Sequence, residues 1–201
     1  MERKVEHRFL PIELRADPEA RKITGHAAIF DSISYSGMYF AEKIAKGAFK
    51  ESIKKDDIRA LFNHNPDYVL GRNIAKTLTL KEDELGLAIE INPPDTQFAR
   101  DLMVSISRGD ISQMSFGFEI TNSDDVNWNE DEIPPLRTIR KAKLWDISPV
   151  TFPFYEDTDV ALKSLAEYRS QVLSHTNVQP PVKHQKQGFR RDHINLLKRR
   201  F

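Results

Sequence analysis

The pattern of apolar and polar residues predicts short β-strands over the first two-thirds of the chain. Alternate side chains of a strand point to opposite faces, so a repeat of two marks a sheet with one buried side. Residues 58–64 follow this repeat, which places His64 at the end of a buried row. Residues 77–81 and 85–91 follow it on either side of an acidic turn and predict a hairpin. Further strands are predicted over residues 9–15, 22–30, 113–120 and 136–150.

A helical repeat replaces the strand pattern in three places. The strongest example runs from a cap at Asp95 or Thr96 to a stop at Gly109, with apolar residues on one face. Shorter helices are predicted over residues 48–53 and 161–175. Residues 122–135 are acidic and contain prolines, which indicates a loop.

The last 26 residues differ from the rest of the chain. Residues 176–201 lack a core-forming pattern and hold seven lysines and arginines against one acid, Asp192. Such a composition is typical of a disordered, solvated tail, or of a segment that docks onto an acidic partner. We therefore expect a domain over 1–160, a C-terminal helix over 161–175 and a basic, disordered tail over 176–201.

The amino-acid composition excludes several kinds of site and of protein. There are no cysteines, which excludes disulfides, thiol catalysis and cysteine-bound metals. No segment approaches the ~18 apolar residues of a membrane helix, and the charged N-terminus does not resemble a signal peptide. These features predict a soluble, intracellular protein. Lysines plus arginines equal aspartates plus glutamates, 30 of each, so the net charge gives no information about a nucleic-acid partner.

Three polar residues stand within otherwise apolar segments: His64, Ser115 and Asp146. A serine hydroxyl is a weak nucleophile until a neighbouring imidazole takes its proton, and the imidazole works better when a third group orients it. The order histidine, serine, acid therefore favours a serine hydrolase. In that role the substrate is expected to bind extended beside the strand that carries Ser115.

Each of these residues also has an ordinary structural explanation. By residue type and setting alone, Ser115 is more often an edge-strand serine and His64 a hydrogen-bonded core residue. Asp146 has basic neighbours with which it can form a salt bridge. His26 is the rival base, and Ser112 is the rival nucleophile.

The neighbourhood of Ser115 suggests how a substrate is bound. Gly117 lies on the same strand face and lacks a side chain where a substrate backbone needs room, so we predict that Gly117 and Phe116 contact substrate. Backbone amides near Gly117 or in residues 148–151 are candidates for the oxyanion hole. No zinc, phosphate-loop or dinucleotide motif is present, and we predict neither a metal nor a cofactor.

Five stretches of the chain together resemble the prohead (capsid maturation) serine proteases of tailed bacteriophages. The similarity covers about residues 8–160, in the expected order. It implies that Ser115 is the nucleophile, His64 the base and Asp146 the third member, at a position where glutamate is common in the family. The matching stretches are residues 24–30, 46–53, 61–72, 109–118 and 144–155.

The resemblance also implies a fold. The family looks related to the herpesvirus assemblin proteases, which have an α+β fold built on a mostly antiparallel β-barrel with surrounding helices. That architecture agrees with the strand-rich pattern of this chain.

The activity implied is that of a serine endopeptidase acting during procapsid maturation. Its expected substrates are scaffold, or the scaffold-like arm of the major capsid protein, and itself, with the portal as a further candidate partner. The expected location is the host bacterial cytoplasm, inside the procapsid, with neither nucleic acid nor membrane as partner, and a homo-oligomer is an open alternative. Residues 176–201 are expected to carry the incorporation signal and to be removed by self-cleavage.

Two other functions fit the same residues. One is a catalytically inactive scaffolding or assembly protein of the same fold. The other is an esterase or amidase acting on small molecules, which a deep apolar pocket at Ser115 would favour.

Overall fold

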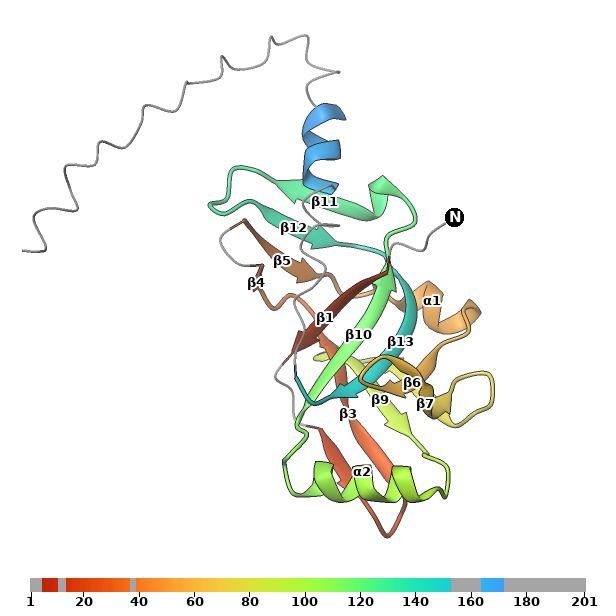
Figure 1. Ribbon diagram of the computed structural model, residues 1–201. Coiled ribbons are helices and arrows are strands. Elements are labelled where there is room, and N and C mark those ends of the chain that lie inside the picture. The colour runs from red at the N-terminus through yellow and green to blue at the C-terminus, as the bar shows by residue number, and fades with distance from the viewer. Residues whose placement is uncertain (1–4, 11–13, 37–38, 153–163, 172–201) are drawn as a thin grey trace, which may run out of the picture. The chain divides into compact units, whose positions relative to one another are not determined.

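A computed structural model describes residues 5–10, 14–36, 39–152 and 164–171 (Figure 1). The chain divides into two units, Met1–Ala166 and Glu167–Phe201. Residues 164–171 are helical and cross the boundary between them. The other elements lie in the first unit: β1 (Glu6–Leu10), β2 (Arg15–Asp17), β3 (Lys22–Ile29), β4 (Ser34–Ser36), β5 (Phe40–Ile44), α1 (Lys50–Lys55), β6 (Arg59–Phe62), β7 (Asn65–Arg72), β8 (Leu78–Glu82), β9 (Gly86–Ile91), α2 (Gln97–Ser107), β10 (Gln113–Glu119), a 3-10 turn (Ser123–Asp125), β11 (Val126–Asn129), β12 (Leu136–Ile139) and β13 (Lys143–Val150).

The five-stranded sheet has the order β1-β10-β13-β6-β7. β10 pairs antiparallel with both β1 and β13, and β13 pairs parallel with β6. One face of β10 carries Met114, Phe116 and Phe118, none of which is exposed. Burying a side chain of this size stabilises the fold by about 1.5–3 kcal/mol. These three side chains therefore fix which face of β10 points away from the core.

Two four-stranded sheets complete the first unit, in the orders β2-β3-β9-β8 and β11-β12-β5-β4. The first consists of antiparallel pairs and has α2 beside β2 (Figure 1). In the second, β12 and β5 run parallel. α2 begins at Thr96, whose side chain accepts a hydrogen bond from the Ala99 amide, and its buried face includes Leu102 and Ile106.

A buried network of four charged side chains joins β1 to β5 and β12. The Arg137 guanidinium donates to both Glu6 and Glu42, and Arg8 donates to the same two carboxylates, at distances of 2.6 to 3.1 Å. Burial alone raises the pKa of Glu42, but the charges of Arg8 and Arg137 outweigh it and lower that pKa below its usual value. Two cations balance two anions, so the charges can be buried together.

Several sequence predictions are confirmed. The predicted hairpin corresponds to β8 and β9, residues 22–30 to β3, and residues 113–120 to β10. Residues 136–150 form two strands, β12 and β13. Within the predicted C-terminal helix, residues 164–171 are helical. The rest of that helix and the tail 176–201 lie outside the described residues.

Other predictions need correction. Residues 122–135 are not only a loop, because β11 lies within them, with Val126 and Trp128 buried on one face. The helix predicted over 48–53 is displaced to Lys50–Lys55. The α+β, mostly β-sheet character is present, but the described strand pairings form three sheets and close none of them. The predicted assemblin-like barrel is therefore not confirmed.

Candidate active site

The structure brings the three predicted residues together. His64 Nε2 lies 2.6 Å from Ser115 Oγ, and His64 Nδ1 lies 2.6 Å from Asp146 Oδ1. Both contacts are short hydrogen bonds. The imidazole thus stands between a hydroxyl and a carboxylate although Ser115 is 51 residues, and Asp146 82 residues, further along the chain.

β10 determines the direction of the Ser115 side chain. Its neighbours Met114 and Phe116 are anchored in the core, so the pleat turns Ser115 to the opposite face. The serine is only 4% exposed, with its hydroxyl held against His64. The rival nucleophile Ser112 is exposed and precedes the strand.

The position of His64 differs from the strand end predicted for it. β6 ends at Phe62, which pairs with Asn65 at the start of β7, so Asn63 and His64 form the turn between the two strands. Both turn residues have left-handed backbones, with φ of 52° and 56°. Two such residues in succession make the tight turn that matches the twist of a hairpin. The strand therefore ends at Phe62, two residues earlier than the sequence pattern predicts.

Asn63 attaches this turn to the end of β13. Its backbone amide donates to the Pro149 carbonyl at 3.0 Å. Its side-chain oxygen accepts from the Thr151 amide at 2.9 Å, and its side-chain nitrogen donates to Thr151 Oγ1 at 3.3 Å. Asparagine also tolerates the left-handed conformation better than most residues. The Thr151 amide, one of the predicted oxyanion donors, is already bonded to Asn63.

A bulge in β13 directs Asp146 toward His64. Gly117 pairs with Asp146 and Phe118 with Leu144, so Trp145 is the extra residue. Asp146 is 8% exposed, and its Oδ1 also accepts a hydrogen bond from the Ser148 hydroxyl at 2.8 Å. The same hydroxyl accepts a bond from the His64 amide at 3.2 Å. Ser148, which is fully buried, thus links the acid to the backbone of the base.

Gly117 lies against the carboxylate of Asp146. A Cβ at this position would be 2.5 Å from Asp146 Oδ2 and 3.2 Å from the ring of His7. The glycine therefore makes room for a carboxylate and an imidazole of the protein itself. Phe116 is fully buried on the other face of β10, with its ring centroid 5.6 Å from that of Phe49, so its side chain is not available to a substrate. Substrate contact by these two residues stays a prediction.

The expectation that substrate pairs beside the Ser115 strand needs revision. β10 lies between β1 and β13 and is hydrogen-bonded on both sides. The free edges of this sheet, among the strands described, are those of β1 and β7. β10 therefore has no free edge to which an extended substrate could add main-chain hydrogen bonds.

The rival base lies elsewhere. His26 Nε2 is 2.9 Å from Asp83 Oδ2, in the sheet of β3, β9 and β8. Backbone hydrogen bonding from Gly86, together with the His26 contact, lowers the pKa of Asp83 to about 2. His26 thus has a structural partner, whereas His64 is the histidine that meets Ser115.

Sequence reasoning missed a second histidine at the site. His7 in β1 pairs with Gly117, and its ring centroid is 4.1 Å from that of His64, with the two planes at 58°. Ligand atoms of His7, His64 and Asp146 all lie within 4.8 Å of one another, the one group among the described residues whose geometry allows a metal ion. Nothing in the sequence around His7 indicates this contact, because β1 reaches β10 only through long-range pairing.

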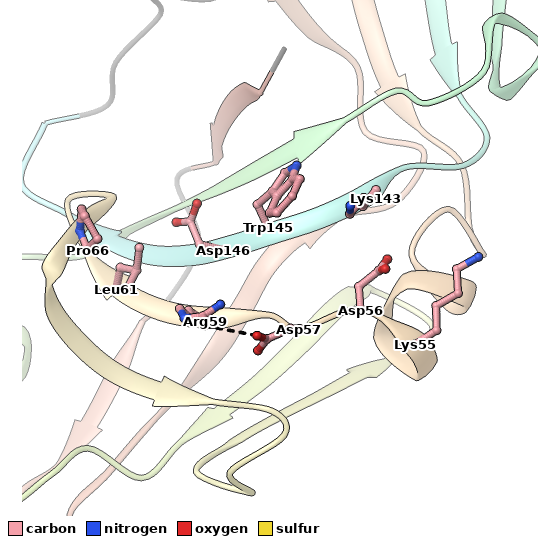
Figure 2. Close-up of a pocket in the computed structure, with 9 residues that line it drawn as sticks. All are labelled: Lys55, Asp56, Asp57, Arg59, Leu61, Pro66, Lys143, Trp145 and Asp146. Atoms are coloured by element: carbon pink, nitrogen blue, oxygen red, sulfur yellow. Dashed lines mark ion pairs between the residues drawn. The ribbon is translucent and has the colours of Figure 1, made fainter. Parts of the chain in front are cut away.

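A cleft of about 590 Å³ borders Asp146 and is lined by residues of the paired strands β6 and β13, of β7 and of the end of α1 (Figure 2). Leu61, Pro66 and Trp145 form its apolar part. Its charged lining consists of Lys55, Asp56, Asp57, Arg59, Lys143 and Asp146. The mixed lining suits polypeptide side chains better than a purely apolar ligand.

Comparison with known proteins identifies the family. The model of the caudovirus prohead serine protease family matches residues 11–171, which is most of the chain. No curated protein and no solved structure matches. No helix in the described ranges is long and apolar enough to cross a bilayer. Because the family match spans every strand from β2 to β13 and includes Ser115, His64 and Asp146, the chain belongs to the caudovirus prohead serine proteases, the proteases of capsid maturation.

Proposed function

We propose that this protein is a serine endopeptidase in which Ser115 is the nucleophile, His64 the general base and Asp146 the orienting acid. The observation that carries the proposal is the contact of one imidazole with both a serine hydroxyl and a buried carboxylate, each at 2.6 Å. A positioned base within hydrogen-bond reach of a hydroxyl is the arrangement that activates serine.

In the first half of the reaction Ser115 Oγ attacks the peptide carbonyl. His64 holds a proton on Nδ1, which donates to Asp146, so Nε2 is free to take the hydroxyl proton. The imidazolium then gives that proton to the leaving amine. The peptide C–N bond breaks, and the new N-terminus departs from an acyl-enzyme.

In the second half a water molecule replaces the amine. His64 takes a proton from the water as it attacks the ester, and returns it to Ser115 Oγ as the ester bond breaks. The carboxylate of Asp146 stabilises the imidazolium in both halves. The chemistry needs only groups that the chain supplies.

The substrates we propose are scaffold or the scaffold-like arm of the major capsid protein, and the protease itself. Family membership supports capsid or scaffold proteins as the class of substrate. The charged cleft beside Asp146 supports a polypeptide over a small apolar ester. The seven basic residues of 176–201 support a role for this segment in docking, followed by its removal through self-cleavage.

Co-expression with the scaffold and capsid proteins of its phage tests this function. Intact-mass analysis should find discrete truncated products with the wild-type chain and only full-length proteins with Ser115→Ala. The serine at position 107, exposed on α2, provides the matched control, and Ser107→Ala should cleave normally. Capsid maturation that proceeds fully with Ser115→Ala would instead support the inactive scaffolding function.

A further inference from the structure

We propose that His7, His64 and Asp146 form an inhibitory binding site for a zinc ion. Its inhibitory effect rests on the proposed function, whereas binding of the ion does not. Of its three ligands, only His7 lies before residue 11, where the family match begins, and His64 and Asp146 lie within the matched residues.

The first argument is the choice of donors. Two imidazoles and one carboxylate are a ligand set that zinc commonly takes, with a water or hydroxyl in the remaining position. The three side chains come from β1, from the turn after β6 and from β13, and converge from different directions. A water molecule can fill the fourth position, so binding of the ion does not require Ser115.

The second argument is distance. Zinc binds imidazole nitrogen at about 2.0–2.1 Å, so a tetrahedral ion holds its ligand atoms roughly 3.4 Å apart. The donor atoms of the three residues lie within 4.8 Å of one another. To bind one ion, any two of them must therefore approach each other by roughly 1.5 Å at most. Rotation of side chains is a change of this size, and both histidines are half-buried, with His7 on the edge strand β1.

The third argument is the space above Gly117. Asp146 Oδ1 is occupied by His64 and Ser148, but Oδ2 lies over the glycine. The Nε2 of His7 lies over the same glycine, 3.2 Å from where its Cβ would be. A carboxylate oxygen and an imidazole nitrogen therefore border one small space next to the base.

The consequence for catalysis follows from the lone pairs of His64. Zinc on Nε2 takes the lone pair that accepts the Ser115 proton. Zinc on Nδ1 leaves the ring proton on Nε2, so in neither case can His64 act as the base. A bound zinc ion therefore inactivates the enzyme, and a chelator restores it. Magnesium, which prefers six oxygen ligands in an octahedron, should not replace zinc here.

The binding arm of the test uses the full chain with Ser115→Ala, which prevents self-cleavage. Calorimetric titration with zinc chloride should give one ion per chain, and magnesium chloride should give no heat. Adding His7→Gln should weaken zinc binding at least about tenfold. A second variant, His7→Phe, keeps a ring against His64 without a donor and should weaken binding equally.

The inhibition arm uses the active chain. Zinc chloride should stop cleavage, and EDTA should restore it. Measured against each variant's own zinc-free rate, His7→Gln should raise the zinc concentration for half-inhibition at least about tenfold. His26→Gln, which removes a histidine paired with a carboxylate elsewhere, should leave inhibition unchanged. Equal inhibition of the wild type and both His7 variants, or no zinc uptake by Ser115→Ala, would overturn the site. If the wild type cleaves nothing, the proposed function fails, and calorimetry still decides whether zinc binds.

Discussion

The hydroxyl of Ser148 donates a hydrogen bond to Asp146 Oδ1 at 2.8 Å and accepts one from the His64 backbone amide at 3.2 Å. One buried side chain therefore fixes both the acid and the loop that carries the base. Ser148 lies opposite Ser115 in the pairing of β10 with β13, but its hydroxyl bonds to Asp146 and to the His64 amide, so its role is to position those two members.

Ser148→Ala should lower kcat about 10- to 100-fold with little change in KM, because loss of a buried hydrogen-bond partner costs about 1–3 kcal/mol. Steady-state kinetics on a peptide substrate, with thermal unfolding measured in parallel, checks this. A variant with wild-type kcat would show that the His64–Asp146 contact holds the imidazole without Ser148.

Gly117→Ala should inactivate the enzyme while the fold persists. The added methyl group would lie 2.5 Å from Asp146 Oδ2, so the carboxylate must leave its bonds to His64 and Ser148. We expect a loss of kcat of about 100-fold or more, as for removal of the orienting acid. Gly109→Ala offers a comparison, since a Cβ there meets nothing within 4 Å although φ is +81°. That variant should lose some stability and retain its kcat.

Two substitutions at Asn63 separate the effect of its left-handed backbone from the effect of its side-chain hydrogen bonds. Asn63→Gly keeps the conformational freedom but loses both side-chain bonds to Thr151, and Asn63→Ala also adds about 1–2 kcal/mol of backbone strain. Activity should therefore fall in the order wild type, Asn63→Gly, Asn63→Ala. Peptide-cleavage rates of the purified variants measure this order. Equal rates for all three would mean that the amide of residue 63, bonded to Pro149, holds the turn alone.

The buried charge network should control stability and not catalysis. Glu42→Gln leaves Arg8 and Arg137 with one carboxylate, and breaking a buried pair in this way costs about 3–5 kcal/mol. Glu84→Gln, at a glutamate whose side chain is 96% exposed, should change stability by less than about 0.5 kcal/mol. Denaturant unfolding of both variants provides the free energies.

The same network predicts a pH dependence. The pKa of Glu42 is lower in the folded chain than the ~4.3 of an unfolded glutamate, so its stabilisation is complete above that value. It is lost as the pH falls through the folded pKa. The stability difference between wild type and Glu42→Gln should therefore shrink below about pH 4. A difference that grows in acid would contradict the sign of this shift.

The sequence was informative wherever local pattern decides structure. Alternating residues around Ser115 correctly predicted both the strand and the face of its hydroxyl, because Met114, Phe116 and Phe118 must be buried together. The same pattern was misleading at His64. The turn there depends on bonds from residues 63 and 64 to the distant β13, which no local repeat records.

The missed features share a physical cause. β5 contains Glu42, which looks like a solvent-facing residue until Arg8 and Arg137 neutralise it in the interior. His7 reaches the site only because β1 pairs with β10, more than a hundred residues later. Both depend on long-range contacts between chemically complementary side chains, and a single sequence does not show which pairs will meet. β11 differs, since Val126 and Trp128 alternate in the expected way, and the acidic residues and prolines nearby obscured the strand.

The central claim is that His64 activates Ser115, and covalent labelling tests it most directly. A fluorophosphonate, which reacts with activated serine hydroxyls, should add one label per chain, and peptide mapping should place it on Ser115. His64→Ala should lose the label, with the fold confirmed by circular dichroism. Labelling of a different serine in an active preparation, or undiminished labelling of Ser115 in His64→Ala, would contradict the account.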